Sequence, residues 1–243
     1  MTEQRDLETQ IAHNLDRISE KIRRSAEQSG RRFEDILLVV VSKKQPVSMV
    51  QAARAVGICH FGENYPEQAV EKLDAFAADQ QIRWHMIGHL QSRKIKLVVD
   101  RFHYLHSLDS QELAVKLDRA LGLASKKLPV LLQFNVGGEE SKHGWDASDE
   151  DRWGSLLGDV EKILQYSHLD VRGLMTMPPL EADPAESRQF FSKLFRLREF
   201  LKKNFPERNW AELSMGTSGD FEAAILEGAT MIRIGQAILG PRL

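Results

Sequence analysis

The spacing of apolar residues predicts a long amphipathic helix followed by a strand that is covered on both faces. Five apolar residues recur at helical spacing among charged ones: Leu7, Ile11, Leu15, Ile18 and Ile22. This pattern predicts a helix over residues 5–28 that ends near Gly30 and lies against a larger body. The six consecutive apolar residues at 36–41 then predict a buried strand of a parallel sheet, as in α/β proteins.

Beyond this strand, short apolar runs alternate with amphipathic stretches. The predicted strands are 36–43, 58–62, 83–88, 103–108, 129–136, 170–176, 211–215 and 230–235. The predicted helices between them are 47–56, 66–79, 91–99, 110–123, 148–166, 184–204 and 219–227. Eight strands that alternate with helices form parallel units with right-handed crossovers and close most naturally into a (β/α)8 TIM-type barrel.

The alternative architecture is an open doubly wound sheet. Its usual dinucleotide signature, GxGxxG, does not follow the first predicted strand, so the barrel is favoured. No linker rich in Pro, Gly or Ser divides the chain. We therefore expect a single domain over residues 1–243, in which residues 1–30 form an extra N-terminal helix packed on the barrel. The longest irregular stretch is predicted at 137–147, over the barrel mouth.

The composition indicates the cellular compartment of the protein and the classes of partner that it can bind. The chain has 243 residues, and 33 Lys and Arg nearly balance 35 Asp and Glu, so we expect neither nucleic acid nor membrane as a partner. The single cysteine, Cys59, excludes an internal disulfide, and the first ten residues lack the blocks of a signal peptide. These features predict a cytoplasmic protein. The surface helices are not conspicuously apolar, which predicts a monomer or a weak dimer.

A lysine ends the first predicted strand. Lys43 lies in VVVSKKQP directly after the apolar run, and the loops after barrel strands are the ones that build functional sites. An ammonium at this position is expected to be partly desolvated, which lowers its pKa and favours the neutral amine that Schiff-base chemistry requires. The alternative is an ordinary solvated lysine, and Lys43 alone does not decide between the two.

The ends of the seventh and eighth predicted strands carry groups that bind phosphate. After the seventh strand, hydroxyl groups, backbone N–H groups and a helix that starts near residue 220 converge, and a glycine and an amide follow the eighth. Barrels often bind phosphate with these two loops. An ordinary capped turn is the alternative, because Ser and Thr are also favoured at helix starts. The predicted contacts are Ser214, Gly216, Thr217, Ser218, Gly235 and Gln236.

An arginine stands inside the apolar strand MIRIG. Arg233 has the same parity as Gly235, so both are expected to face the lumen of the barrel. A buried guanidinium needs a partner, which is either a neighbouring carboxylate or a ring nitrogen of a cofactor. With Lys43 and the phosphate-binding loops, Arg233 completes the set of contacts that pyridoxal 5′-phosphate needs.

Other strand ends add weaker signals. Asn64 either bonds the cofactor or ties a turn, and Met175 and Met177 either offer polarisable surface beside a ring or fill the core. His85 is predicted to be a hydrogen-bonded core residue. We predict no metal site, because the histidines do not stand at ligand spacing with carboxylates and HExxH is absent.

Seven motifs in this order together resemble the pyridoxal phosphate homeostasis protein family: VSKKQP, FGENY, WHMIGHLQSRK, QFNVGGEESKHG, GLMTMPP, LSMGTSGDFEAAI and RIGQAILG. The resemblance implies a single barrel like the N-terminal domain of alanine racemase, of fold type III among proteins that bind this cofactor. It implies a Schiff base between pyridoxal 5′-phosphate and Lys43. It also implies that Asn64, Arg233, the 214–218 loop and Gly235 contact the cofactor.

The chain departs from the family pattern at several positions. Thr217 replaces the second methionine of S-M-G-M-S, where an added hydroxyl should not harm phosphate binding. Gln236 stands where threonine or serine is usual, so a hydroxyl contact to the phosphate is lost or replaced by an amide. Arg93 replaces a common asparagine and Leu239 a phenylalanine, and none of these changes removes a defining group.

The resemblance implies a carrier or regulator of the cofactor that acts on vitamin B6 and amino-acid balance without established turnover and therefore without catalytic residues. PLP-dependent apoenzymes are the candidate recipients. An arginine beside the pyridine nitrogen keeps that nitrogen unprotonated and the ring a poor electron sink. Two-base racemisation would also need a group from a further β domain, which the sequence does not contain. The alternatives are a PLP-dependent amino-acid racemase or lyase and a Schiff-base aldolase without a cofactor, which typically has a lysine inside strand six.

Overall fold

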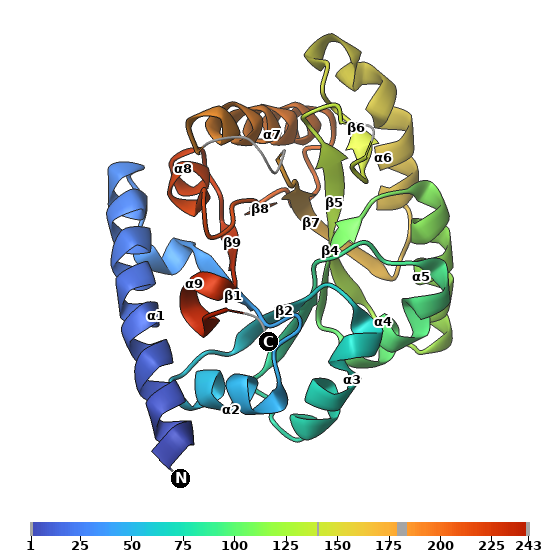
Figure 1. The fold of residues 1–243 in the computed structure, drawn as a ribbon. Coiled ribbons are helices and arrows are strands. Elements are labelled where there is room, and N and C mark those ends of the chain that lie inside the picture. The colour runs from blue at the N-terminus through green and yellow to red at the C-terminus, as the bar shows by residue number, and fades with distance from the viewer. Residues whose placement is uncertain (1, 140, 179–183, 242–243) are drawn as a thin grey trace.

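Eight parallel strands close into a barrel that helices surround (Figure 1). The structure is a computed structural model that describes residues 2–139, 141–178 and 184–241. The barrel strands are β1 (Leu37–Val41), β2 (His60–Glu63), β3 (Arg83–Met86), β4 (Tyr104–Leu108), β5 (Leu128–Asn135), β7 (Leu169–Met175), β8 (Glu212–Ser214) and β9 (Met231–Ile234). They pair in the order β4-β3-β2-β1-β9-β8-β7-β5, and β4 also pairs with β5, which closes the ring and confirms the predicted (β/α)8 barrel.

The helices alternate with the strands as the apolar spacing predicts. They are α1 (Thr2–Gln28), α2 (Val47–Ala55), α3 (Pro66–Ala75), α4 (Ile95–Arg101), α5 (Gln111–Leu123), α6 (Leu157–Leu164), α7 (Pro184–Asn204), α8 (Phe221–Leu226) and α9 (Gln236–Leu239). Short 3-10 turns lie at η1 (Phe33–Asp35), η2 (Ser92–Lys94) and η3 (Glu150–Leu156). The predicted helix at 148–166 is therefore divided into η3 and α6.

The stretch at 137–147 is more regular than its sequence suggests. It contains a two-residue strand, β6 (Trp145–Asp146), that pairs with the end of β5 through Phe134 opposite Trp145. The loop folds back sharply at Gly144, which has a φ of 110°. A Cβ atom on this residue would lie 2.5 Å from the carbonyl oxygen of Gln133, so only glycine allows the approach. Apart from β6, the described residues of 137–147 form no helix or strand, so the predicted irregular stretch is confirmed outside these two residues.

The N-terminal helix α1 packs along α2, α8 and α9 on the outside of the barrel (Figure 1). Its buried face is formed by Ile11, Ile18 and Ile22, as predicted. Asn14 adds a hydrogen bond of 3.1 Å from its Nδ2 to the carbonyl oxygen of Ile238 in α9. The helix therefore covers the helices that flank the neighbouring strands β1 and β9.

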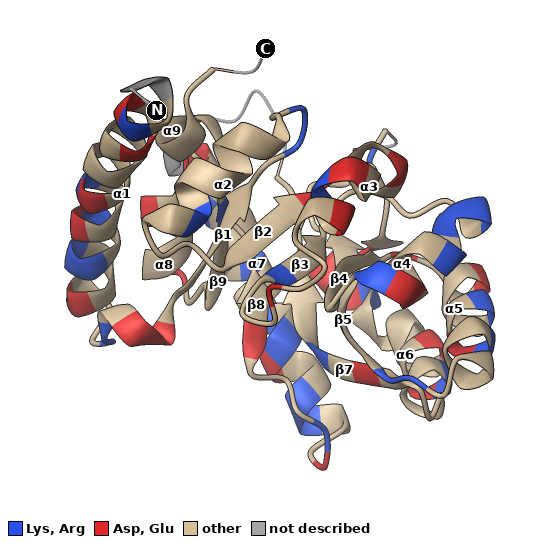
Figure 2. Cartoon of the chain, turned by 90° about the horizontal axis from the view of Figure 1, so that it is seen from below, with Lys and Arg blue, Asp and Glu red and all other residues tan. Residues whose placement is uncertain are grey.

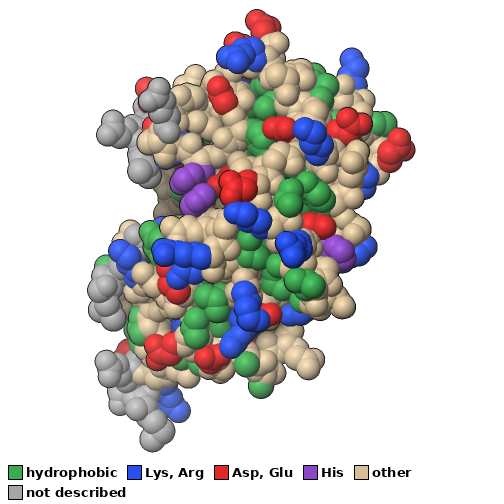
Figure 3. Space-filling view, turned by 90° about the vertical axis from the view of Figure 1, so that its right-hand side faces the viewer, with side chains coloured by type: hydrophobic (Ala, Val, Ile, Leu, Met, Phe, Trp, Pro, Cys, Tyr) green, Lys and Arg blue, Asp and Glu red, His purple; other side chains and the backbone are tan. Residues whose placement is uncertain are grey.

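Charged side chains of both signs are mixed over the surface. Figure 2 shows Lys and Arg alternating with Asp and Glu along α1, and Figure 3 shows the same mixture on the face it presents. On that face no single-sign field is present that would attract a polyanion. Within the described ranges, no helix has both the length and the apolar character that a membrane crossing requires.

A buried polar cluster joins β1, β2 and α3. The ammonium of Lys72 pairs with the carboxylate of Glu63 and donates a 2.8 Å hydrogen bond to the carbonyl oxygen of Ser42. The Ser42 hydroxyl donates to the same carboxylate at 2.7 Å. All three side chains are buried. This cluster fixes the backbone immediately before Lys43.

We expect Lys72→Met to lower the free energy of unfolding by about 3–5 kcal/mol, because it leaves the Glu63 carboxylate buried without its charge partner. Urea unfolding of the two chains measures the difference. Adding Glu63→Gln removes the stranded charge and should restore part of the loss. A double variant no more stable than Lys72→Met alone would contradict this cause.

Candidate functional site

A cavity of about 220 Å³ opens at the carboxyl end of the barrel. Seven of the ten cofactor contacts predicted from the sequence line it. The lining residues are Val41, Lys43, Asn64, Ile87, Met177, Thr217, Ser218, Arg233, Gly235 and Gln236.

A tight turn separates two neighbouring lysines. The N–H of Gln45 bonds the carbonyl oxygen of Ser42 at 3.1 Å, and Lys44 takes a φ of 59° inside this turn. Ser42 is itself tied to β2 by a 3.0 Å bond from its N–H to the carbonyl oxygen of Gly62. Lys43 consequently lines the cavity, whereas the side chain of Lys44 is exposed outside it.

Arg233 is buried at the base of the cavity. Its Nη1 donates to the hydroxyl of Ser214 at 2.6 Å, and its Nη2 donates to the carbonyl oxygen of Thr176 at 2.9 Å. No carboxylate among the described residues forms an ion pair with Arg233. The predicted alternative of a neighbouring carboxylate partner is therefore not found within these residues. Burial lowers the pKa of Arg233 to about 10 and the charge of Asp220 opposes this, so the guanidinium stays charged at neutral pH.

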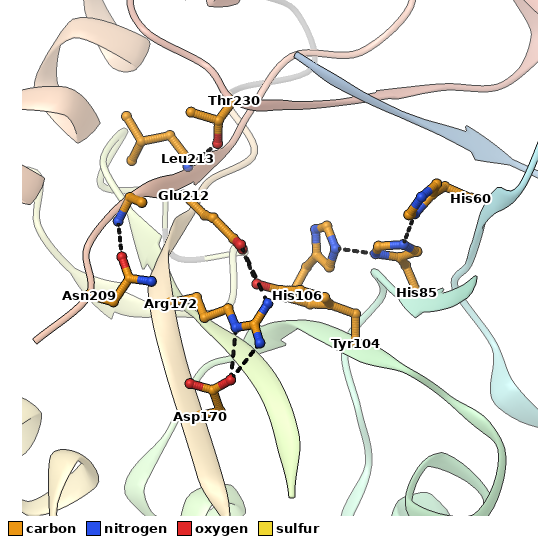
Figure 4. A network of polar contacts seen from close by, with 11 residues as sticks. His60, His85, Tyr104, His106, Asp170, Arg172, Asn209, Glu212, Leu213 and Thr230 are labelled. Carbon is orange, nitrogen blue, oxygen red and sulfur yellow. Dashed lines mark hydrogen bonds and ion pairs between the residues drawn. The ribbon is translucent and has the colours of Figure 1, made fainter. Parts of the chain in front are cut away.

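A chain of hydrogen bonds runs from Arg233 through the barrel lumen. The Ser214 hydroxyl lies 2.8 Å from Nδ1 of His106, Nε2 of His106 lies 2.9 Å from Nδ1 of His85, and Nε2 of His85 lies 3.0 Å from Nδ1 of His60. Figure 4 shows the three imidazoles in this sequence. His85 is thus a hydrogen-bonded core residue, as predicted.

The direction of these bonds follows from the arginine. A guanidinium only donates, so Ser214 accepts from it. Ser214 has no other acceptor among the described residues, and its hydrogen is used when it donates to Nδ1 of His106. Each neutral imidazole then donates from Nε2 to the next: His106 to His85, and His85 to His60. Burial holds the pKa of His85 and of His106 well below the usual value, which keeps both rings neutral.

The chain of imidazoles ends near a second, larger cavity at the amino end of the barrel. This cavity, of about 640 Å³, is lined by His60, Tyr104, Arg172 and Glu212 among others, and by none of the ten predicted contacts. Tyr104 donates to the Glu212 carboxylate, and Arg172 pairs with Asp170 at 2.8 Å (Figure 4). Burial raises the pKa of Glu212, although the bonds to Tyr104 and Arg172 oppose it.

Three predicted contacts do not line the carboxyl-end cavity. Ser214 lies beneath it and supports Arg233. Met175 is buried in a cluster inside the lumen, and Met177, which is 37% exposed, lines the cavity instead. Gly216, with a φ of 91°, lets its loop approach α8, since a Cβ there would lie 2.6 Å from the Cβ of Ala224.

The loop after β8 offers hydroxyl and backbone groups, but one hydroxyl is already engaged. The N–H and the hydroxyl of Thr217 both donate to the carboxylate of Asp220, at 2.6 and 3.0 Å. Ser218 is exposed, and no described residue bonds its hydroxyl. Gly235 lies against β1, where a Cβ would meet the carbonyl oxygen of Val41 at 3.1 Å. The Thr217 hydroxyl and N–H are therefore engaged within the loop, whereas the Ser218 hydroxyl is open to solvent.

Sequence reasoning missed the apolar lining and the histidine chain. Val41 and Ile87 line the cavity but carry no chemical signal in the sequence. His106 shares a strand face with Tyr104, and the parity argument that placed Arg233 in the lumen would have found it. Its partners, however, depend on which strands become neighbours.

The fold agrees with comparisons to known proteins. The family described as alanine racemase, N-terminal domain, matches residues 10–242. A solved alanine racemase from Clostridium difficile superposes with a TM-score of 0.69 at 15% identity, covering 95% of this chain and 56% of the racemase. The barrel is therefore of the alanine racemase N-terminal type.

Closer relatives narrow the family. The pyridoxal phosphate homeostasis protein of Vibrio alginolyticus is 38% identical over 96% of this chain and 97% of its own length, and that of Escherichia coli K12 is 35% identical over 96% and 97%. PipY of Synechococcus elongatus, solved with PLP bound, superposes with a TM-score of 0.82 at 32% identity over 95% of this chain and all of its own. The chain belongs to the pyridoxal phosphate homeostasis protein family.

We expect the free energy of unfolding to fall as the pH is lowered below about 6.5, the usual pKa of an unfolded imidazole. Below this pH both imidazoles bind a proton in the unfolded chain, whereas buried His85 and His106 stay neutral in the folded chain. Acid therefore favours unfolding by up to about 1.4 kcal/mol per pH unit for each ring. Urea unfolding between about pH 7.5 and 5 measures the slope.

His106→Gln removes one of these rings and should reduce the slope between the same pH values. His13→Gln, at an exposed position of α1, serves as the control and should leave the slope unchanged. Equal slopes in the parent chain and His106→Gln would contradict the assignment of a neutral, buried imidazole.

Proposed function

We propose that this chain binds pyridoxal 5′-phosphate and takes part in its homeostasis as a carrier or regulator, with Lys43 as the point of covalent attachment. The observation that carries the proposal is a single cavity lined by the Lys43 amine, the Arg233 guanidinium and the Thr217–Ser218 loop. The names of the relatives and the bound PLP of the PipY structure support the same ligand.

The residues of the cavity fit this cofactor. The buried Oδ1 of Asn64 has no hydrogen-bond partner among the residues that the structure describes, so this amide is available to a ligand group. Lys43 would hold the aldehyde, Arg233 the pyridine nitrogen, and Ser218 with the backbone N–H groups near Gly235 the phosphate. Ile87 and Met177 add apolar surface for the ring.

The environment of Arg233 favours binding over turnover. When bound, the cofactor supplies an electron sink only to the extent that its ring nitrogen is protonated. Arg233 stays charged and can only donate, so a nitrogen that receives its hydrogen bond remains unprotonated. Ser214 and Thr176 hold the guanidinium in this role from below.

The cavity also contains few acid–base groups. Among the described side chains that line it, Lys43 and Arg233 are the ionisable ones, and Arg233 keeps its charge. Racemisation needs an acid or base on each face of a substrate. A Schiff-base aldolase typically has a lysine in the sixth barrel strand, but this strand, β7, reads LDVRGLM and contains no lysine. We therefore propose a non-enzymatic role.

We further propose that PLP-dependent apoenzymes receive the cofactor. Lys43 is half-buried and the side chains of Ser218 and Gln236 are exposed, so the cavity opens to solvent at the barrel mouth. Exchange of a bound ligand through this mouth requires no opening of the barrel.

We expect Lys43→Ala to abolish covalent attachment of the cofactor while the fold persists, because truncation at an open mouth leaves no closed void. Borohydride reduction of the loaded chain, followed by peptide mapping, locates the modified lysine. Circular dichroism reports the fold.

Lys44→Ala is the matched control, because it removes the neighbouring lysine that the turn places outside the cavity. It should retain the modified peptide. A label on Lys44, or full labelling of Lys43→Ala, would show that the proposed attachment site is wrong.

We expect no racemisation of L-alanine or other single-enantiomer amino acids by the cofactor-loaded chain, because the described residues that line the cavity include no second base. Chiral chromatography after long incubation measures the product, with Lys43→Ala as the background. Racemisation by the parent chain that is lost in Lys43→Ala would favour the enzyme alternative instead.

A further inference from the structure

We propose that His89, Asp109 and His143 form a binding site for a divalent transition-metal cation of the zinc type. The ligand atoms of the three side chains all lie within 4.8 Å of one another. Nδ1 of His89 is 2.6 Å from Oδ2 of Asp109, and the rings of His89 and His143 stack with centroids 3.8 Å apart. The inference concerns a different site from the cofactor cavity and does not rest on the proposed function.

The backbone holds His89 and Asp109 at fixed positions. Gly88, directly before His89, accepts a 2.5 Å hydrogen bond from the Ser107 hydroxyl. It also lies so close to β2 that a Cβ would be 2.4 Å from the carbonyl oxygen of Asn64. Asp109 follows the last residue of β4, and its side chain is only 5% exposed. Two of the three groups are thus preorganised by the barrel.

The third group comes from the loop that folds back onto β5. The carbonyl oxygen of His143 accepts a 3.0 Å hydrogen bond from Nε2 of Gln133. Gly144 then presses against the backbone of the same residue, and β6 follows directly. The turn at 143–144 brings His143 beside His89, although the two belong to loops after β5 and β3.

The donor set selects the class of metal. Two imidazole nitrogens and one carboxylate oxygen suit borderline ions such as Zn²⁺, Co²⁺ or Ni²⁺, whereas Mg²⁺ and Ca²⁺ prefer oxygen ligands alone. In a tetrahedral zinc site, ligand atoms lie about 3.4 Å apart, given metal–ligand distances of about 2.1 Å. The exposed rings of His89 and His143 can turn to close the remaining gap while Asp109 stays in place. Water would fill the open positions.

A second histidine–aspartate pair shows what the third ligand adds. His168 lies 3.1 Å from Asp118, but no third ligand group in the described part of the chain joins them. This pair therefore provides the matched control. It has the same two residue types on the surface and lacks the geometry of a three-ligand site.

Isothermal titration with ZnCl2 of the full chain, without an affinity tag, tests the site. We expect one saturable equivalent, at least about tenfold weaker binding in His89→Ala and in His143→Ala, and unchanged binding in His168→Ala. Titration with CoCl2 should give visible absorption bands that His143→Ala abolishes. A tenfold excess of MgCl2 should not compete.

Asp109→Asn conserves the volume of a nearly buried side chain, so it tests the third ligand without opening a void. It should also weaken Zn²⁺ binding while the circular dichroism spectrum is unchanged. The proposal is overturned if the parent chain shows no saturable equivalent, if His143→Ala binds as tightly as the parent, or if His168→Ala weakens binding equally.

Discussion

The hydrogen bond from Arg233 to Ser214 determines the direction of the hydrogen bonds inside the barrel. A guanidinium can only donate hydrogen bonds, so Ser214 accepts one from Arg233. Each group that accepts a hydrogen bond in this series then donates one to the next group. The result is a directed series of bonds through His106 and His85 to His60. Removing any member would leave a buried polar atom without a partner, which is the costly outcome in a water-free interior.

Strand pairing brings Lys43 and Arg233, the two proposed cofactor contacts, to one mouth of the barrel. β1 and β9 are neighbours, with Val39 opposite Arg233. Lys43 therefore follows the strand that lies directly beside the arginine, although the two residues stand at opposite ends of the sequence. The buried Glu63–Lys72 pair then holds Ser42, so that the amine of Lys43 is presented from a fixed backbone.

The carboxyl-end rim carries two different kinds of chemistry. The loops after β1, β2, β7, β8 and β9 line the cavity that holds Lys43, whereas those after β3, β4 and β5 bring His89, Asp109 and His143 together. Ile87, from the loop after β3, also lines that cavity. Gly88 joins the two regions, because its backbone packs against Asn64. The same ring of strands therefore supports both groups of loops, as is usual in barrels of this type.

The sequence by itself determined the barrel, the lumenal parity of Arg233 and the strand-end position of Lys43, because each follows from the local period of apolar residues. The tertiary structure decided what the sequence left open. In the folded chain Ser214 lies outside the cavity lining, and Met177 lines the cavity in place of Met175. The strand β6 pairs with β5, and hydrogen bonds join three histidines from different strands. Periodicity fixes the face of a strand on which a side chain lies. Its partner is fixed only when closure of the barrel makes distant strands and loops neighbours.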